Sequence, residues 1–503
     1  MKLRIFTGCF LLATAIVAGC GNKIDGSLVI QPIWPCELDP AVVDSEVGNW
    51  CLSVIRSDGT EGEKSCASSL EGISLTADEK SGQVRLKLEA WDKFNIMYAR
   101  GVSVPLRLES GKDNSLPIAM SLIGRFSLIA GDVTGCSRLP FHMGVSQALG
   151  LPSGHLLAAG CADPDNGDDT GRCALLIDPS NYRLVTLATP PSARRFGHQM
   201  VALKDGRVLV AGGLDMSNNP LDSLLMLRGG DIFLQPYQTG LDYSLVRFEQ
   251  LALGLKSARQ FPTVASVFFG NQVLINDGSG NTPEMWLGTS ESSDYISLSG
   301  TDPFPYDGTL KYAQAVASID ESRAVVLGGV ADHQGLLAVA QNSRQVSFTS
   351  FNIPLEARNA PKTVVLDGGD VMFIGGKTNT SSSLSPVLVL NVNSRQLTEV
   401  PATAGVFPQG GFTATLLADG RVLVAGGFSG TTGFKPGSSF LISRTNDPLN
   451  PWKMETGPDL KMPRLFHSSA LLPDGRLILI GGGSSDTAVE HKRVMLSAEV
   501  VTF

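Results

Sequence analysis

The nine residues DGRVLVAGG occur twice without a change, at 205–213 and at 419–427, which is 214 residues apart. More diverged copies align on the end of this stretch: GHLLAAGC from Gly154, NQVLINDG from Asn271, SRAVVLGG from Ser322, GDVMFIGG from Gly369 and GRLILIGG from Gly475. The identical copies are then separated by four periods of about 53.5 residues, a length typical of one β-propeller blade. The repeat restricts this part of the chain to seven copies of one supersecondary unit.

Each copy is the second half of a predicted hairpin. A further apolar stretch precedes it, as in HQMVALKDGRVLVAGG and FTATLLADGRVLVAGG. Two short β-rich runs joined by Asp-Gly or a similar turn indicate a tight β-hairpin. The frequent glycines, β-branched residues and turn signals argue against helices.

In five copies the second strand ends in a glycine pair: Gly212–Gly213, Gly328–Gly329, Gly375–Gly376, Gly426–Gly427 and Gly481–Gly482. Over roughly residues 118–503 this pattern resembles the Kelch repeat, whose hallmark is a glycine pair at the end of the second strand of a four-stranded blade. Gly160-Cys161 and Asp277-Gly278 depart from it. The resemblance implies a seven-bladed Kelch-type β-propeller. We interpret the pairs as structural, because a missing side chain lets another strand approach closely.

The last repeat lacks one strand. After GRLILIGG the sequence offers only RVMLSAEVVTF before Phe503. The strand-like stretch IAMSLIGRFSLIA, residues 118–130, lies just before the first repeat. Because a closed propeller leaves only short, protected edges, we expect this stretch to pair with the C-terminal strand and close the ring. The propeller is thus predicted to span residues 116–503.

Residues 26–115 lack the repeat and predict a small β-sandwich domain. In QVRLKLEA the apolar residues Val84, Leu86 and Leu88 alternate with charged ones, which gives one apolar face. We therefore expect an all-β protein, a seven-bladed Kelch-type β-propeller preceded by a small β-sandwich. The sandwich is expected to space or orient the propeller, and an independent binding site is the alternative.

The N-terminal residues indicate export. Lys2 and Arg4 precede an apolar run, a pattern typical of a secretory signal peptide, here residues 1–19. The segment VAGC resembles the bacterial lipobox, which implies cleavage before Cys20, acylation of Cys20 by chains such as palmitate, and a lipid-anchored linker over residues 20–25. Gly21 favours the outer membrane over the inner one. An ordinary signal peptide or an uncleaved anchor are the alternatives.

The net charge of the chain is -8. We expect no nucleic-acid partner, because phosphate binding requires a basic face and the sequence shows none.

Beyond Cys9 and Cys20, six of the eight cysteines remain, an even number that predicts disulfides in an exported chain but allows 15 pairings. Cys161 and Cys173 flank a short loop between two predicted strands, and we expect them to bond. The loop contains DPDNGDD, whose carboxylates suit Ca²⁺. The residues of this candidate metal site are Asp163, Asp165, Asp168 and Asp169. A solvated acidic loop is the alternative, because the EF-hand spacing is missing.

Arginine recurs just before the first strand of four repeats, 17 or 18 residues ahead of the glycine-pair position: Arg194, Arg259, Arg358 and Arg464. At one rim of the channel these side chains could bind carboxylates or an acidic sugar through charge-assisted hydrogen bonds. Alternatively, each arginine ties adjacent blades by bonding loop carbonyls. His198 and His467 also share a repeat position, and we expect hydrogen-bonded strand histidines, because a metal site needs more ligands nearby.

Propellers host both scaffolds and enzymes, so function must be argued from a site. No GxSxG or HExxH motif is present. Galactose oxidase, a Kelch-type copper enzyme, uses a Cys linked to Tyr with further Tyr and His ligands, and no matching constellation can be assembled here. A bacterial sialic-acid mutarotase with Kelch blades is compatible with the arginine positions.

We therefore expect a cell-envelope lipoprotein whose propeller binds an envelope protein or a saccharide. The alternative is a sugar-acting envelope enzyme, mutarotase-like or oxidase-like, with its site at the channel mouth. A rim cluster of titratable residues with shifted pKa values would indicate the enzyme, whereas an exposed apolar or mixed patch would indicate the binding module.

Overall fold

The computed structural model describes residues 13–17, 27–75, 83–106, 114–141, 143, 146–160, 173–190, 194–229, 242–267, 272–276, 284–288, 292–295, 297–298, 315–320, 322–327, 334–342, 345–352, 358–359, 361–378, 387–401, 407–428, 437–483 and 495–503. Strands dominate these residues. The described residues contain one α-helix, α1 (Pro40–Glu46), and two 3₁₀ turns, η1 (Leu70–Gly72) and η5 (Tyr243–Leu245).

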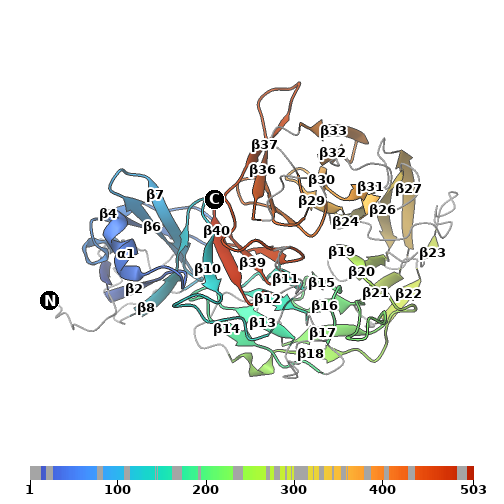
Figure 1. Ribbon diagram of the computed structural model, residues 1–503, viewed down its shortest axis with the longest axis horizontal. Helices are drawn as coiled ribbons and strands as arrows, with labels where there is room; N and C mark the ends of the chain where they lie inside the picture. Colours follow the sequence, from blue (N-terminus) through green and yellow to red (C-terminus); the bar gives the residue numbers. More distant parts are fainter. Residues whose placement is uncertain are drawn as a thin grey trace, which may run out of the picture.

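Seven antiparallel sheets form a ring (Figure 1). Blade 1 contains β11 (Gln147–Gly150), β12 (Leu156–Ala159), β13 (Ala174–Ile177) and β14 (Leu184–Thr186). Blade 2 contains β15 (Gln199–Ala202), β16 (Val208–Ala211), β17 (Leu224–Arg228) and β18 (Arg247–Gln250). Blade 3 contains β19 (Thr263–Val267), β20 (Gln272–Asn276), β21 (Glu284–Leu287) and β22 (Ser292–Tyr295).

Blade 4 contains β24 (Ala315–Ser318), β25 (Arg323–Leu327), β26 (Gln334–Asn342) and β27 (Gln345–Asn352), with β23 (Ser297–Leu298) added in parallel to β27. Blade 5 contains β29 (Lys362–Val365), β30 (Val371–Ile374), β32 (Val387–Asn391) and β33 (Gln396–Val400). Blade 6 contains β34 (Thr413–Leu416), β35 (Val422–Ala425), β36 (Ser439–Arg444) and β37 (Trp452–Thr456). Blade 7 contains β38 (Ser468–Leu471), β39 (Arg476–Ile480), β40 (Ala498–Thr502) and β10 (Ser127–Ala130).

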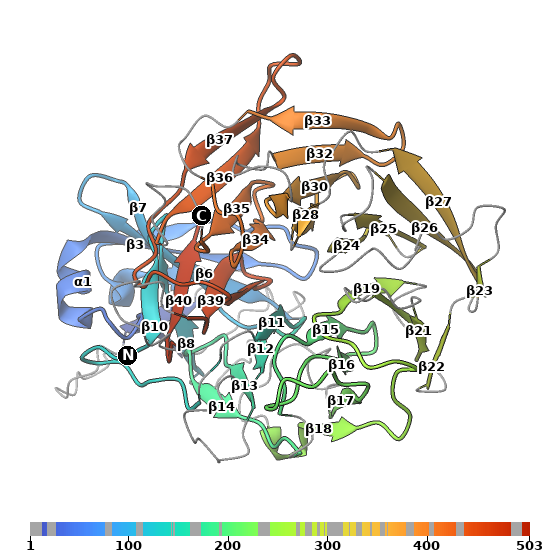
Figure 2. The same cartoon turned by 45° about the vertical axis from the view of Figure 1, so that its right-hand side comes forward.

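The first strand of each blade lies innermost. Each packs beside the first strands of both neighbouring blades, and β38 packs beside β11, so the ring is closed (Figure 2). The second strands of blades 1, 2, 5, 6 and 7 are buried at every residue, as expected for strands covered on both faces. The expected fold, a seven-bladed Kelch-type β-propeller preceded by a small β-sandwich, is confirmed.

The glycine pairs allow neighbouring blades to approach. The N–H of Gly213 donates to the carbonyl of Arg259 in the next blade at 2.8 Å, and the N–H of Gly427 donates to Arg464 at 2.9 Å. A Cβ on the first glycine of these pairs, Gly212 or Gly426, would lie 2.7 or 2.5 Å from the same carbonyl oxygens. Any side chain would therefore force the blades apart.

The last blade is built from both ends of the described propeller. In the order β38-β39-β40-β10, strand β10 is outermost and pairs antiparallel with the C-terminal strand β40. Of the stretch 118–130, residues 127–130 form this strand, and Ile123 adds one parallel bridge to Thr502 of β40. The earlier part belongs to the sandwich, as the end of β8 (Asn114–Ala119) and as β9 (Ser121–Leu122). The sandwich therefore continues past the predicted boundary at residue 115.

The sandwich has two sheets. One is β5-β1-β2-β8, with β1 (Ala13–Val17), β2 (Ser27–Ile33) and β5 (Ser74–Leu75). The other is β4-β3-β6-β7-β9, with β3 (Val47–Ile55), β4 (Ser65–Ala67), β6 (Arg85–Asp92) and β7 (Met97–Val102). Val84, Leu86 and Leu88 are buried in its core, as their alternation predicted. Strand β1 lies within the predicted signal peptide and pairs with β2, whereas Cys20 and residues 20–25 lie outside the described residues.

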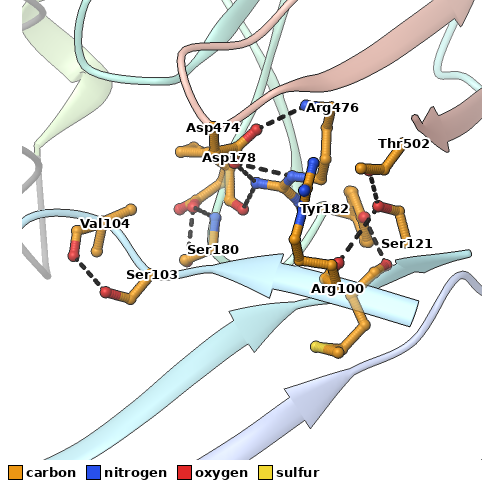
Figure 3. A network of polar contacts seen from close by, with 12 residues as sticks. Arg100, Ser103, Val104, Ser121, Asp178, Ser180, Tyr182, Asp474, Arg476 and Thr502 are labelled. Carbon is orange, nitrogen blue, oxygen red and sulfur yellow. Dashed lines mark hydrogen bonds and ion pairs between the residues drawn. The ribbon is translucent and has the colours of Figure 1, made fainter. Parts of the chain in front are cut away.

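The sandwich lies beside blade 7 (Figure 1), and polar contacts join it to the propeller (Figure 3). The Tyr182 hydroxyl of blade 1 donates to the Met120 carbonyl at 2.7 Å, and burial raises the pKa of Tyr182, which keeps this donor protonated. Ser121 and Thr502 share a hydrogen bond between their hydroxyls. The Cys36–Cys136 disulfide adds a covalent link, and Cys51–Cys66 staples β3 to β4.

Within the part of the chain that the structure describes, no helix is long and apolar enough to cross a bilayer.

We expect Gly426→Ala to lower the free energy of unfolding by several kcal/mol, because it adds a clash with the Arg464 carbonyl to the cost of a left-handed alanine at φ +65°. Gly420→Ala is the matched control. Gly420 is also left-handed, at φ +81°, but its nearest contact for a Cβ is the flexible Asp367 side chain at 3.6 Å, so only the conformational cost of about 1 kcal/mol applies. Urea unfolding compares the two variants. Equal losses of unfolding free energy would contradict the role of glycine in the close contact between blades.

Candidate binding site at the channel mouth

All first strands begin at the same end of the central channel, here called the mouth. Each first residue pairs with the last residue before the glycine-pair position of its blade, as Gln199 pairs with Ala211 and Ser468 with Ile480. In blades 2, 3, 6 and 7, where the structure describes them, the two residues before the first strand form a turn at the mouth. Side chains on these turns are therefore displayed around the channel opening.

Two phenylalanines on these turns have a left-handed backbone. Phe261 has φ +47° and Phe466 has φ +55°, whereas blades 2 and 6 place Gly197 and Gly411 at the equivalent position. A bulky residue in this region of the backbone map costs of order 1 kcal/mol, and glycine avoids that cost. Strain of this kind concentrates at functional sites, so these rings are candidates for contact with a ligand.

Three rings at the mouth remain partly exposed, Phe261 at 43%, Phe428 at 42% and Phe466 at 45%, and we call them the aromatic rim. The Phe261 ring lies against Gly197 of blade 2, only 2.5 Å from where a Cβ would stand. Phe428 of blade 6 lies against Gly410, and its ring centroid is 5.8 Å from that of Phe466 in blade 7. Each ring rests on a glycine or another ring and keeps accessible surface.

A shallow cleft of about 450 Å³ opens on blade 2 at the same end of the propeller. Its polar lining includes both charges and an amide: Arg194, Asp215, Ser217, Asp222 and Gln250. Asp215 accepts hydrogen bonds from the Asn219 side-chain amide and from the Asn219 and Ser217 backbone N–H groups, and these bonds lower its pKa. The cleft therefore offers fixed hydrogen-bond donors and acceptors outside the aromatic rim.

Of the arginines predicted at the rim, Arg259 and Arg464 are completely buried. Arg259 is ion-paired with Glu284 at 2.6 Å, and Arg464 with Glu499 at 2.6 Å, each across its own blade. Arg464 also donates to the Gly481 carbonyl at 3.0 Å. These guanidinium groups do not face the opening, so the ligand-binding interpretation does not apply to them. The sequence did not indicate that these arginines are buried, because their partner glutamates lie on the third strands, far along the chain from each arginine.

The partner carboxylates also hold the preceding loop. Glu284 accepts hydrogen bonds from the backbone N–H groups of Lys256 and Ser257, and Glu499 accepts them from Lys461 and Met462. A buried carboxylate paired in this way satisfies its oxygens as well as its charge. The arginine–glutamate pairs thus fix the position of the turns that carry Phe261 and Phe466.

In blade 2 the equivalent residue is Arg195, one position after the predicted Arg194. Arg195 is buried and donates to the Gly212 carbonyl at 3.0 Å and the Ser223 carbonyl at 2.9 Å, while Arg194 lines the cleft. Arg195 stands four residues before its first strand, as Arg259 and Arg464 do, whereas Arg194 stands five residues before it. Arg358 lies in β28 (Arg358–Asn359), which pairs with β31 (Lys377–Thr378), but its side chain lies outside the described part.

His198 and His467 lie in the seams between blades. The His198 ring lies near Gly160 of blade 1, and His467 lies near Gly426 of blade 6 and accepts or donates a hydrogen bond at 3.0 Å with Thr413. Burial lowers the pKa of His198 to about 3, helped by the nearby Arg195 charge, and burial with the Arg464 charge lowers that of His467. Both imidazoles are therefore neutral at physiological pH.

The predicted calcium ligands Asp163, Asp165, Asp168 and Asp169 lie outside the described residues, as does Cys161. Cys173 is disulfide-bonded. Among the residues that the structure describes, no three His, Cys, Asp or Glu side chains come together as a metal site would require.

The aromatic rim was missed from the sequence although a signal existed. Phe261 and Phe466 each stand two residues after the repeated arginine, in the segments RQF and RLF. The left-handed backbone and the exposure of the rings could not be read from that pattern.

No family model and no curated protein matches this chain. Among solved structures, a fungal alcohol oxidase of the AA5 family in complex with copper is similar over 73% of this chain and 75% of its own, with 14% identity and a TM-score of 0.52. The structure of YjhT covers 73% of this chain and 96% of its own, with 11% identity and a TM-score of 0.40. At such identity the oxidase shares the fold alone, and no copper chemistry is transferred to this chain.

We expect Arg464→Leu to lower the free energy of unfolding by about 3–5 kcal/mol, because it leaves Glu499 charged and buried without its partner. Arg194→Leu is the matched control: it removes an arginine from the equivalent loop of blade 2. It should change the free energy of unfolding by less than about 1 kcal/mol, since this side chain is partly exposed. Chemical denaturation measures both. A loss below 1 kcal/mol for Arg464→Leu would show that the buried pair does not hold the turn.

Acid should destabilise the protein from about pH 6.5 down to about pH 3. His198 stays neutral in the folded state to about pH 3, whereas in the unfolded chain it takes up a proton near its ordinary pKa of 6.5, so stability falls as pH falls through this window. His198→Asn should reduce the loss between pH 7 and pH 4 by the contribution of one proton. Urea midpoints at the two pH values test this, and an unchanged pH dependence would refute it.

Proposed function

We propose that this chain is a lipid-anchored protein of the bacterial cell envelope whose propeller binds a glycan at the channel mouth. The aromatic rim is the stacking surface of this site. The observation that carries the proposal is the left-handed backbone of Phe261 and Phe466. At both positions an exposed aromatic ring is present although glycine would avoid the backbone strain.

The chemistry of the mouth suits a saccharide. A sugar ring presents an apolar face of C–H groups that packs against an aromatic ring, and hydroxyls at its edge that need hydrogen-bond partners. The aromatic rim supplies the first requirement. The cleft on blade 2 supplies the second through groups such as Arg194, Asp222 and Gln250.

Binding is favoured over catalysis by what the mouth displays. The rim contributes rings, while Arg259 and Arg464, which the enzyme alternative would use at the opening, are buried inside their blades. An envelope protein is the competing partner, since an exposed aromatic patch also suits a protein interface.

Several features support placement in the envelope. Lys2, Arg4 and the segment VAGC are typical of a lipoprotein signal. The disulfides Cys36–Cys136 and Cys51–Cys66 and the disulfide-bonded Cys173 suit an oxidising compartment. We propose that Cys20 carries the lipid, in the outer membrane, and that the sandwich holds the propeller above the bilayer.

We expect Phe466→Gly to weaken binding to isolated envelope polysaccharide by about tenfold, since a lost stacking contact is worth roughly 1 kcal/mol or more. The melting temperature should not fall, because glycine adopts φ +55° without strain. Phe94→Ala is the control: Phe94 is 73% exposed but lies on the sandwich. Affinity gels and thermal melts provide the readouts.

Unchanged retention of Phe466→Gly would contradict the role of the rim. A stoichiometric protein captured from crosslinked envelopes, and lost with this variant, would replace the glycan by a protein partner.

A further inference from the structure

The seven innermost strands contain a single charged residue. Their sequences are QALG, QMVA, TVASV, AVAS, KTVV, TATL and SSAL. Lys362, the first residue of β29 in blade 5, is therefore the one charge on the strands that line the channel. A lone cation among neutral residues on such a surface requires a physical explanation.

Lys362 lies at the mouth. It pairs with Ile374, the residue directly before the glycine pair of blade 5, so it occupies the same level as Gln199 and Ser468 in their blades. Its side chain is exposed to solvent, yet the surrounding protein desolvates the ammonium and lowers its pKa. Exposure combined with desolvation is expected of a group inside a narrow water-filled channel.

The charge of Lys362 also acts on His467 of blade 7. Burial and the Arg464 charge lower the pKa of His467 most, and the Lys362 charge adds a smaller contribution. Among the described residues Lys362 has no ion pair. Lys362 is therefore a positive charge at the channel mouth without an ion-pair partner among the described residues.

Neutral polar groups accompany Lys362 at the same level. The first residues of five other innermost strands are Gln147, Gln199, Thr263, Thr413 and Ser468. Gln147 and Gln199 bond to each other at 2.5 Å, whereas the buried Thr263 hydroxyl has no hydrogen-bond partner among the described residues. The Thr413 and Ser468 hydroxyls are already bonded to His467 and to the Ser146 carbonyl. A ligand at this level would therefore meet one ammonium and no competing carboxylate on these strands.

We propose that the channel mouth is an anion-binding site in which the Lys362 ammonium binds a carboxylate group. One monovalent carboxylate balances one ammonium, and lysine binds it as a point charge with three donors, without the planar fork that arginine would impose. The carboxylate belongs either to a small free acid or to an acidic sugar seated under the aromatic rim. This anion site is formed by residues of the innermost strands, and its existence does not require the aromatic rim to bind a glycan.

Binding should depend on pH in one direction. The ammonium must be protonated, and its pKa in the free protein is lowered, so affinity is highest above the pKa of the carboxylate and falls as pH rises through that of Lys362. Binding of the anion in turn raises the pKa of Lys362, because the two equilibria are linked.

The test is calorimetric titration of the full chain with three probes: acetate, galacturonate and the neutral galactose. We expect Lys362→Met to weaken galacturonate binding at least tenfold and to leave galactose binding unchanged, while Lys362→Arg retains most of the galacturonate affinity. Lys453→Met, on the outer strand β37, is the control at an exposed lysine. Acetate binding at similar strength identifies a free acid, and galacturonate binding alone identifies an acidic sugar.

Equal anion affinity of the wild-type chain and Lys362→Met, or no anion binding by the wild-type chain, would overturn the proposal. Galactose binding and its loss in Phe466→Gly report on the rim separately, so failure of either site is distinguishable. Lys362→Met should fold, because it removes a desolvated charge, and its melting temperature should equal or exceed that of the wild-type chain. A second readout is ¹³C NMR of the methylated amine, whose pKa should rise when galacturonate is added.

Discussion

The ring depends on one backbone contact between neighbouring blades, in which a glycine N–H meets the carbonyl of the turn before the next first strand. Gly213, Gly427 and Gly482 make it with Arg259, Arg464 and Met143. Because both partners are backbone groups, the contact fixes the spacing of blades without depending on side chains. It works only where glycine removes the Cβ that would strike the carbonyl.

The same turns connect architecture to the candidate site. At Arg464 the carbonyl joins blade 6 to blade 7, the side chain enters blade 7 to meet Glu499, and two residues later Phe466 points an exposed ring at the mouth. A buried ion pair of this kind contributes more to a defined geometry than to net stability. The left-handed backbone of Phe466 thus lies in a segment that is held both by a backbone hydrogen bond and by a buried ion pair.

Periodicity explains which features the sequence could predict. The blades, the glycine pairs and the missing outer strand recur or fail to recur at a fixed spacing, so they can be read without coordinates. Arg194 was chosen in place of Arg195 because the longer hairpin of blade 3 puts Arg259 18 residues ahead of its glycine-pair position, a spacing that Arg194 also has, whereas Arg195 matches the 17 residues of Arg464. The Cys36–Cys136 bond spans 100 residues and two domains, so no local pattern indicates it. Lys362 is visible as a charge, but its meaning requires knowing which strands line the channel.

The composition of blade 7 determines when the ring can form. Strand β10 precedes the first repeat and β40 follows β39 of the seventh blade, so an emerging chain carries an unpaired β10 edge until β40 has been made. Exposed strand edges template wrong pairings, and contacts so distant in sequence form slowly. Six blades can be complete while the ring is still open. The protein is therefore most prone to aggregation in the interval before β40 pairs with β10.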